Sequence, residues 1–308
     1  NANWRENAYC IFLNNGVIIY GSADACVGMS EKYRSPLWEG TGYGAGDAMK
    51  IAFFDSGIGG LAVLHHAMKV LPGEQFIFYA DEDHVPYGTK PREEVRGFVE
   101  EAFAFLSKQD VKAIVTACNT ATSVAVEEMR QLYDIPIIGM EPAVKRALDM
   151  DGSHRVLVTA TPITVTGEKM RELMRTVDLG HLVDLLPLPR LVEFAERSEF
   201  QSEEVMEYLR TQLAPYDLTQ YSALVLGCTH FNYFKSSFRK LLPDSVRFVD
   251  GNSGTVKELV RQLRSRDLLE TLPQTVDYYY SGRKVMDLLE LGRLQGYLRR
   301  LDEMYFLD

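Results

Sequence analysis

Two cysteines occupy matching contexts in this chain of 308 residues. The first ends the run Ala113-Ile-Val-Thr-Ala-Cys118, and the second ends Ala223-Leu-Val-Leu-Gly-Cys228. Each follows a short apolar run and precedes small polar residues, a pattern typical of a strand that ends in a sharp turn. Two opposed thiols could remove a proton from one face of a carbon atom and return one to the other face.

The positions of these cysteines argue for a function. A lone buried cysteine is usually a small hydrophobic residue. A thiol between a strand and a helix start, however, gains thiolate character from the helix dipole, and ligands bind at this edge of open α/β sheets. Asn119 and Thr120 follow the first cysteine, and Thr229 and His230 follow the second. These side chains could contact a ligand or cap a helix, and His230 could tune the Cys228 thiol or be a hydrogen-bonded core histidine.

A glycine-rich segment, Asp55-Ser-Gly-Ile-Gly-Gly60, follows the first expected strand. Glycines there allow close backbone approach to a ligand, although a plain strand–helix turn is the alternative. With Ala62 and Asp81, the segment also matches a dinucleotide-binding fingerprint. Asp55 would press a carboxylate towards a pyrophosphate, so we do not favour nucleotide binding. Further on, the turn around Tyr87 and Gly88 could close over a ligand.

Strands and helices alternate from Met49 onward, which predicts parallel sheets with helices on both faces. We therefore expect two pseudo-symmetric, doubly wound α/β domains with the active site in the cleft between them. The expected boundaries are 49–141 plus 252–308 for the first domain, which carries Cys118, and 142–251 for the second, which carries Cys228. The predicted strands are 51–54, 76–80, 113–117, 135–139, 155–160, 182–186, 223–226 and 276–281, the last at a sheet edge. The predicted helices are 61–70, 91–108, 123–132, 165–177, several across 188–213, and most of 258–308.

Residues 1–48 differ from the remainder of the chain. They lack helical periodicity and end in a glycine-rich stretch, Gly40-Thr-Gly-Tyr-Gly-Ala-Gly46. We interpret them as an N-terminal extension, non-native or flexible, that is dispensable for the chemistry, with Met49 as a natural initiator. Cys10 and Cys26 have no motif around them, and we expect them to be inert.

Composition narrows the class of protein. A formal net charge of −10 and a pI of about 5.2 argue against nucleic acid or an anionic membrane as partner. We find neither an apolar run long enough for a spanning helix nor a secretory signal. None of the four cysteines lies in a C-x-x-C motif, so we expect no metal site and reduced thiols in the cytoplasm.

Together, the ordered motifs resemble the glutamate racemases of the cofactor-independent aspartate/glutamate racemase family, from about Lys50 to Gly254. The motifs are Asp55-Ser-Gly-Ile-Gly-Gly, Val85-Pro-Tyr-Gly, Thr116-Ala-Cys-Asn-Thr-Ala-Thr, Leu226-Gly-Cys-Thr-His-Phe and Gly251-Asn-Ser-Gly254. The resemblance implies interconversion of L- and D-glutamate for peptidoglycan synthesis, with a small-molecule substrate, no cofactor and often a homodimer. It makes Cys118 and Cys228 the two acid/bases, supported by Asp55 and His230 respectively. It implies a substrate shell of Asp55, Ser56, Tyr87, Gly88, Asn119, Thr120, Thr229 and His230, and suggests Thr164 and Glu196 as further site residues.

The chain also departs from the family pattern. Gly167 and Met170 stand where many relatives carry Ser and Tyr, and Leu188-Pro189 stands where Cys-Pro is common. Because of these departures, the resemblance does not assign the residues at the rim of the substrate site. The alternatives are a two-cysteine racemase of aspartate or hydantoins, a non-catalytic glutamate-binding relative and, as noted, a nucleotide-dependent enzyme.

Overall fold

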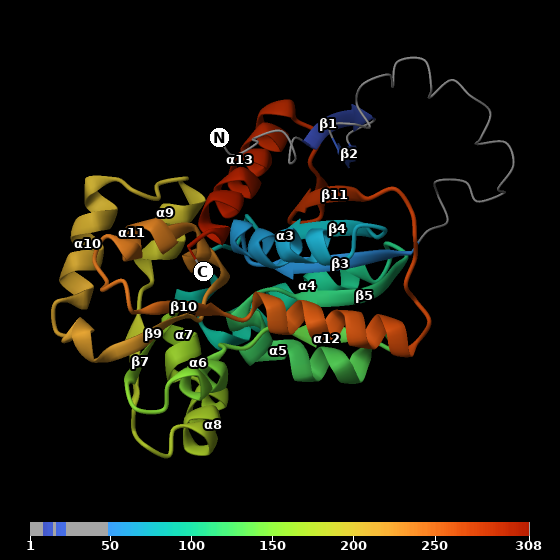
Figure 1. The fold of residues 1–308 in the computed structure, drawn as a ribbon. Coiled ribbons are helices and arrows are strands. Elements are labelled where there is room, and N and C mark those ends of the chain that lie inside the picture. Colours follow the sequence, from blue (N-terminus) through green and yellow to red (C-terminus); the bar gives the residue numbers. More distant parts are fainter. Residues whose placement is uncertain (1–8, 15–16, 23–48, 308) are drawn as a thin grey trace, which may run out of the picture.

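The computed structural model describes residues 9–14, 17–22 and 49–307 of the chain. These residues form two sheets, mostly of parallel strands, with helices packed around them (Figure 1). The predicted α/β fold class with mainly parallel sheets is therefore confirmed. The domain boundaries above stay a prediction, and we describe the two sheets and their helices as the first and second unit.

The first unit is built on a sheet with strand order β1-β2-β11-β4-β3-β5-β6, and β12 pairs with β11. Strands β3, β4, β5, β6 and β11 run parallel, with β3 paired to both β4 and β5. Nearly every residue of the central strands is buried, which fits their continuous apolar runs. The bounds are β3 Lys50–Asp55, β4 Gln75–Ala80, β5 Val111–Thr116, β6 Ile137–Gly139, β11 Thr275–Tyr280 and β12 Arg283–Lys284.

Part of the N-terminal segment joins this sheet as a hairpin of β1 (Tyr9–Asn14) and β2 (Val17–Ser22). Strand β2 pairs antiparallel with β11. The hairpin thus extends the first sheet, while the interpretation of residues 1–48 as an extension that is dispensable for the chemistry stays a prediction. The expectation of an edge strand at 276–281 is wrong, because β11 lies between β4 and β2. The dipeptide Asn15-Gly16 between two apolar runs is a hairpin signal that the sequence analysis passed over. Cys10 falls within β1, whereas Cys26 lies outside the described residues.

The second unit has four parallel strands in the order β10-β9-β7-β8. Their bounds are β7 Arg155–Ala160, β8 Val183–Pro187, β9 Tyr221–Leu226 and β10 Arg247–Asp250. Strand β10 was not predicted, because four residues are too few for a periodic signal. The sheet is smaller than the first but repeats the arrangement β4-β3-β5 as β8-β7-β9.

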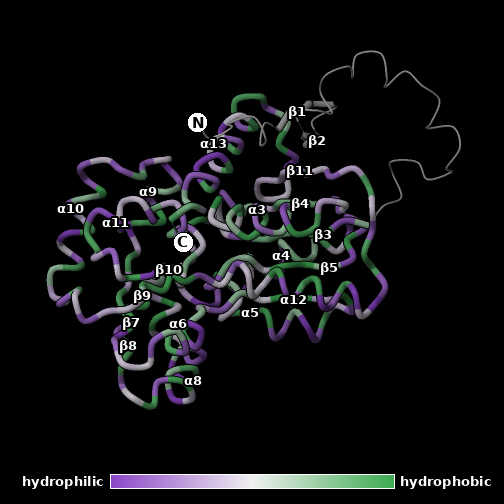
Figure 2. The backbone as a smooth tube through the Cα atoms, in the orientation of Figure 1, coloured by the Kyte–Doolittle hydropathy of each residue, from purple (hydrophilic) through white to green (hydrophobic). Residues whose placement is uncertain are grey.

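Helices cover both faces of the first sheet (Figure 1). Apolar side chains of α4 and α5 form one core with one face, while α3, α12 and α13 contribute to the core on the other. Hydrophobic and hydrophilic stretches alternate along outer helices such as α12, as expected for helices with one buried face (Figure 2). Their bounds are α3 Leu61–Val70, α4 Arg92–Leu106, α5 Asn119–Leu132, α12 Asn252–Ser265 and α13 Leu288–Tyr305.

The helices of the second unit are shorter. Residues 165–177 were predicted as one helix, but the chain is extended at Gly167 (φ −69°, ψ 153°), which separates α7 from α8. A Cβ at Gly167 would lie 2.9 Å from the Ile163 carbonyl oxygen, so a larger residue at this break would require the backbone to shift. The bounds are α6 Val144–Met150, α7 Pro162–Thr166, α8 Glu168–Val177, α9 Arg190–Glu196, α10 Glu203–Leu213, the 3-10 segment η4 Thr229–Phe234 and α11 Lys235–Arg239.

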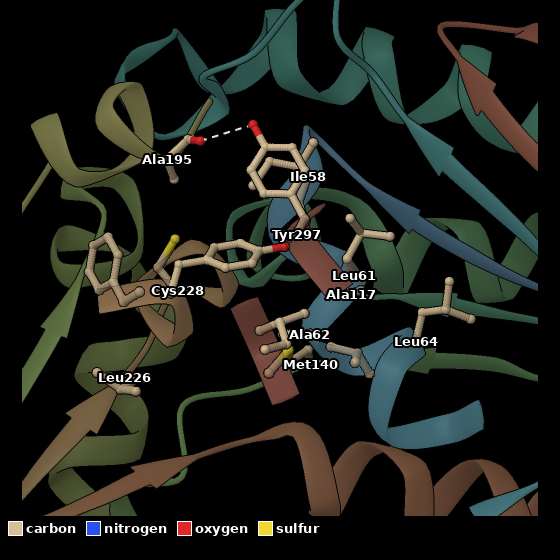
Figure 3. Packing of buried hydrophobic residues seen from close by; sticks show 14 of the residues in the cluster. Ile58, Leu61, Ala62, Leu64, Ala117, Met140, Ala195, Leu226, Cys228 and Tyr297 are labelled. Atoms are coloured by element: carbon tan, nitrogen blue, oxygen red, sulfur yellow. Dashed lines mark hydrogen bonds between the residues drawn. The ribbon is translucent and has the colours of Figure 1, made fainter. Parts of the chain in front are cut away.

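One buried cluster runs without interruption from the first unit into the second. It includes Ile58 and Leu61 of the first unit, Leu226 and Cys228 of the second, and Tyr297 of α13. Figure 3 shows these side chains close together around Cys228. The two units therefore share a core, and this core sets the position of Cys228.

Candidate active site

The site lies where the strand order of each sheet reverses, which is where open α/β sheets bind ligands. In the first sheet, Asp55 ends β3, and Cys118 follows the neighbouring strand β5. In the second sheet, Thr161 follows β7, and Cys228 follows the neighbouring strand β9. The two switch points face one another, so each sheet brings one thiol to a shared site.

A cavity of about 10 Å³ lies between the two thiols. Both sulfurs are nearly buried, each cysteine being 6% exposed. Nine of the predicted site residues line the cavity: Ser56, Tyr87, Gly88, Cys118, Asn119, Thr120, Cys228, Thr229 and His230. Thr161 and Val192 complete the lining, and sequence reasoning missed both of them.

Cys118 sits at the N-terminus of α5, where its sulfur accepts a hydrogen bond from the Ala121 N–H at 3.4 Å. The thiol also donates to Ser56 Oγ at 3.8 Å. Burial raises the pKa of Cys118 well above its usual range, and the neighbouring Asp55 carboxylate raises it further. The expectation of thiolate character at this sulfur is therefore wrong for this conformation, because burial and Asp55 outweigh the helix N-terminus.

Asp55 is fully buried beside Cys118. Its carboxylate accepts hydrogen bonds from the Ser56 N–H at 2.8 Å and from Thr229 Oγ1 at 3.2 Å. Burial raises its pKa, although the positive charge of His230 and a hydrogen bond from Cys118 act in the opposite direction. Through Thr229, this first-unit carboxylate is tied directly to the second unit.

Cys228 has a different set of neighbours. Its sulfur lies 3.8 Å from His230 Nδ1, and the other ring nitrogen, Nε2, lies 2.6 Å from Glu196 Oε1. Burial lowers the pKa of His230, but its hydrogen bonds to Cys228 and Glu196 more than offset this effect, so that its pKa lies well above the usual range. A protonated His230 places a positive charge next to the Cys228 sulfur, which stabilises negative charge there.

The glycine-rich segment fits closely around the residues that support Cys228. A Cβ at Gly57 would lie 2.0 Å from Glu196 Oε1, and one at Gly59 would lie 2.2 Å from His230 Nδ1. The N–H of Ile58 in the same segment donates to Glu196 Oε1 at 3.1 Å. The space that a dinucleotide would need at these glycines is thus filled by protein side chains, which argues against nucleotide binding.

The turn that carries Tyr87 and Gly88 approaches the second unit just as closely. The hydroxyl of Tyr87 donates to Asp81 Oδ2 at 2.6 Å, and burial raises the pKa of this tyrosine. A Cβ at Gly88 would lie 2.4 Å from the side chain of Thr161. Glycine at this position therefore lets the turn close against the far wall of the cavity.

Three threonines form a buried hydroxyl cluster at that wall. Thr120 and Thr161 lie 2.9 Å apart, and Thr161 and Thr164 lie 3.1 Å apart, between their Oγ1 atoms. Thr164 therefore belongs to the layer behind the cavity. Both amide atoms of the buried Asn119 side chain, by contrast, have no hydrogen-bond partner within residues 49–307, so they are available to a ligand.

A sequence signal for Thr161 existed. The first strands of the two units align as Ile51-Ala-Phe-Phe-Asp-Ser with Val156-Leu-Val-Thr-Ala-Thr, which places Thr161 opposite Ser56. Ser56 was recognised and Thr161 was not. Val192 is an apolar residue in an ordinary helix, and nothing in the sequence marks it as part of a site.

The described residues also bear on metal binding and on membrane insertion. No group of three His, Cys, Asp or Glu side chains among them is placed to hold a metal ion. None of the helices in that part of the chain is long and apolar enough to cross a membrane.

Comparison with known proteins agrees with this geometry. The family model described as Asp/Glu/Hydantoin racemase matches residues 61–259. A glutamate racemase of Campylobacter curvus is 53% identical over 262 residues, covering 83% of this chain and 98% of the relative. Glutamate racemase 2 of Bacillus subtilis is 46% identical over 257 residues, covering 83% and 97%. The crystal structure of glutamate racemase from Francisella tularensis in complex with D-glutamate superposes with a TM-score of 0.70 at 28% identity, covering 82% of this chain and 94% of that one.

Fold and site thus define a class, that of two-unit α/β proteins in which paired thiols share one buried cavity. Within that class, the sequence matches identify the lineage. The chain belongs to the Asp/Glu/Hydantoin racemase family.

Proposed function

We propose that this protein is a glutamate racemase that interconverts L- and D-glutamate and supplies D-glutamate for peptidoglycan synthesis. The observation that carries the proposal is the pair of buried thiols that line one small cavity. The choice of glutamate is supported by relatives of that name at 53% and 46% identity across almost their whole length.

The reaction needs one base and one acid on opposite faces of the α-carbon. The sulfur of one cysteine, as thiolate, takes the α-proton and leaves a carbanion. The opposite thiol then donates its proton to the other face, which inverts the centre and leaves that cysteine as the thiolate. The two thiols serve as proton acceptor and proton donor, so the proton transfers balance without a further group. Since the reverse reaction follows the same path backwards, each cysteine is the base in one direction and the acid in the other.

The surroundings of the thiols must offset the weak acidity of the α-proton. Preorganised donors and exclusion of water stabilise developing charge more strongly than bulk solvent does. The free amide of Asn119 and the hydroxyl groups of Thr120 and Thr229 are suitable donors on the cavity wall. We assign Asp55 to orient Cys118, and His230 to stabilise the charge on Cys228.

The cavity implies that the two units must separate to admit substrate. Its volume of about 10 Å³ is room for roughly one water molecule, far less than an amino acid requires. Glutamate must therefore enter a more open state, after which closure excludes water. Hydrogen exchange at the segments around Gly57 and Gly88 should slow when glutamate is added. Unchanged exchange and an unchanged solution scattering profile would contradict the opening and closing of the two units.

The function is tested by incubating purified protein with L-glutamate without added cofactor and following the circular dichroism signal. We expect the signal to decay to zero with wild type and to persist with Cys118→Ala or Cys228→Ala. L-aspartate and a chiral hydantoin are assayed in parallel, and turnover of either one alone would assign the chain to another racemase of the family. Tight glutamate binding without any turnover would support the non-catalytic relative.

The proposal has two further parts, the oligomeric state of the protein and its location in the cell. The homodimer implied by the sequence resemblance stays a prediction, which sedimentation of the purified chain would test. The cytoplasmic location likewise stays a prediction, and it accords with a chemistry that needs two reduced thiols.

A further inference from the structure

The C-terminal helix α13 contacts the second unit directly behind the supports of Cys228. Helix α9 ends at Glu196, and the last carbonyl groups of a helix have no partner within it. Two side chains of α13 bond to carbonyl groups of this last turn, where the Ser198 N–H also donates to the Ala195 carbonyl oxygen at 2.8 Å. Arg293 donates to the Glu196 carbonyl oxygen, and the Tyr297 hydroxyl lies 3.2 Å from the carbonyl oxygen of Ala195 and 3.3 Å from that of Glu196. Figure 3 shows the Tyr297 hydroxyl directed at Ala195.

The cap formed by Arg293 and Tyr297 is itself well ordered by its surroundings. Tyr297 is 2% exposed, and its hydroxyl accepts hydrogen bonds from Ser198 Oγ at 2.8 Å and from Arg293 at 3.1 Å. A cationic side chain at a helix C-terminus also interacts favourably with the helix dipole. Helix α13 therefore fixes the last turn of α9 by several contacts at once.

The residue held in this way is the one that reaches the catalytic histidine. The Glu196 carboxylate accepts hydrogen bonds from Ile58 N–H at 3.1 Å and His230 Nε2 at 2.6 Å, and His230 Nδ1 lies 3.8 Å from the Cys228 sulfur. Direct contacts thus lead without a gap from α13 to one of the two thiols. The hydrogen bonds of Cys118 lead instead to Ser56 and Ala121, which lie outside α13.

We propose that Arg293 and Tyr297 are positioning residues for the Cys228 half of the reaction. By capping α9 they hold Glu196 against His230, and this keeps the imidazole aligned with the sulfur. The inference rests on the proposed racemase function. It assigns to the C-terminal helix a role in proton transfer in addition to its role in the shared core.

Tyr297→Phe and Arg293→Gln are the variants that test the proposal. Both retain most of the packing, and we expect each to lower kcat about tenfold while KM stays within about twofold, because small misplacements at a catalytic group are costly. The matched controls are Tyr305→Phe and Arg299→Gln, two exposed residues of the same helix, which should leave kcat unchanged. Thermal unfolding of all four variants would check that each variant retains the folded state.

A double variant separates positioning through Glu196 from a merely structural role. If Tyr297 acts through Glu196, Tyr297→Phe should have little effect in a Glu196→Gln background. Isotope effects with α-deuterated L- and D-glutamate provide a second readout. If only the proton transfer at Cys228 is slowed, the isotope effect should rise in the direction in which Cys228 removes the proton. The isotope effect should fall in the opposite direction. The proposal would be overturned if the losses of kcat in the double variant were the product of those in the single variants. Equal changes of the isotope effect in both reaction directions would also overturn it.

A third readout does not require turnover. The ¹⁵N NMR signals of His230 report its protonation, and loosening Glu196 should lower its apparent pKa in Tyr297→Phe and not in Tyr305→Phe. If wild type fails to racemise glutamate, the proposed function is wrong, and this titration alone decides the positioning role. Identical titrations in wild type and Tyr297→Phe would refute that role.

Discussion

The two halves of the site place their thiols at equivalent points of the fold but support them differently. Phe54 of β3 pairs with Thr116 of β5, and Thr159 of β7 pairs with Leu226 of β9, so both cysteines follow their strand by the same interval. Beside the first thiol, β3 ends in the carboxylate of Asp55. The equivalent residue of β7 is an alanine, and the second thiol is supported by an imidazole and a more distant carboxylate.

This difference gives the two thiols unequal electrostatic surroundings. The carboxylate of Asp55 and burial favour the protonated form of Cys118. The raised pKa of His230 favours a positive charge beside the sulfur of Cys228. In a fold with approximate internal symmetry, the two thiols thus have neighbours of opposite charge. The substrate enantiomers have equal energy, but the enzyme that converts them is asymmetric.

The largest expected effect comes from removing either thiol. Cys118→Ala and Cys228→Ala should each lower kcat/KM by at least about 10³-fold in both directions, because every turnover uses one cysteine as base and the other as acid. Polarimetric assays started from each enantiomer measure this. Near-normal activity of either variant in one direction would contradict the division of work between two thiols.

Substitution of the residue beside each thiol should affect one of the two proton-transfer steps and not the other. Asp55→Asn and His230→Asn should each lower kcat by about 10²-fold, the first by slowing the Cys118 step and the second by slowing the Cys228 step. Primary isotope effects measured from α-deuterated L- and D-glutamate should therefore change in opposite senses in the two variants. The same pattern in both would mean that the two residues do not serve separate cysteines.

A smaller effect is expected at Gly59, whose missing side chain leaves room for His230. Gly59→Ala would place a Cβ 2.2 Å from His230 Nδ1, so we expect kcat to fall about tenfold and stability to fall by about 1–3 kcal/mol. Gly254→Ala is the matched control, because it meets nothing within 4 Å inside α12. This control should stabilise the fold by about 0.5–1 kcal/mol without changing kcat, as urea denaturation and steady-state assays would show.

The smallest effect concerns pH and stability. The pKa of His230 is raised in the folded state, so its contribution to stability is present below its unfolded value of 6.5 and is lost as the pH rises through the folded value. Above this pH range, the Tm of wild type should therefore approach that of His230→Asn. Each kcal/mol of stability that is lost should lower Tm by about 2–4 °C. A constant difference in Tm between the two proteins from pH 6 to pH 10 would contradict the raised pKa.

Much of the asymmetry could be predicted from the sequence, because it is carried by local motifs. The apolar runs before Cys118 and Cys228 predicted strands that end at one edge, and the polar residues after them line the cavity as expected. Helix α3 and strand β7 have the predicted bounds. Each of these features depends on a short stretch of chain with a clear pattern of apolar residues.

The features that were missed depend on contacts between distant parts of the chain. Burial, which raises the pKa of Cys118, depends on contacts with residues distant in the chain, such as Ser56. The contact between Arg293 and Glu196 joins residues 97 positions apart, and neither residue carries a local signal for it. The pairing of β2 with β11 joins the N-terminal segment to a strand near the C-terminus, so periodicity within either segment could not reveal it.

Two thiols that act on opposite faces of one carbon should leave a distinct pattern of hydrogen isotopes when the reaction runs in D₂O. Wild-type protein is incubated with L-glutamate, the reaction is stopped at low conversion, and the enantiomers are separated and weighed by mass spectrometry. We expect deuterium at the α-carbon of the D-glutamate formed and protium in the L-glutamate recovered, because the product proton comes from the second thiol. Deuterium in the recovered substrate to the same extent, or protium retained in the product, would indicate a single base and rule out the two-thiol mechanism.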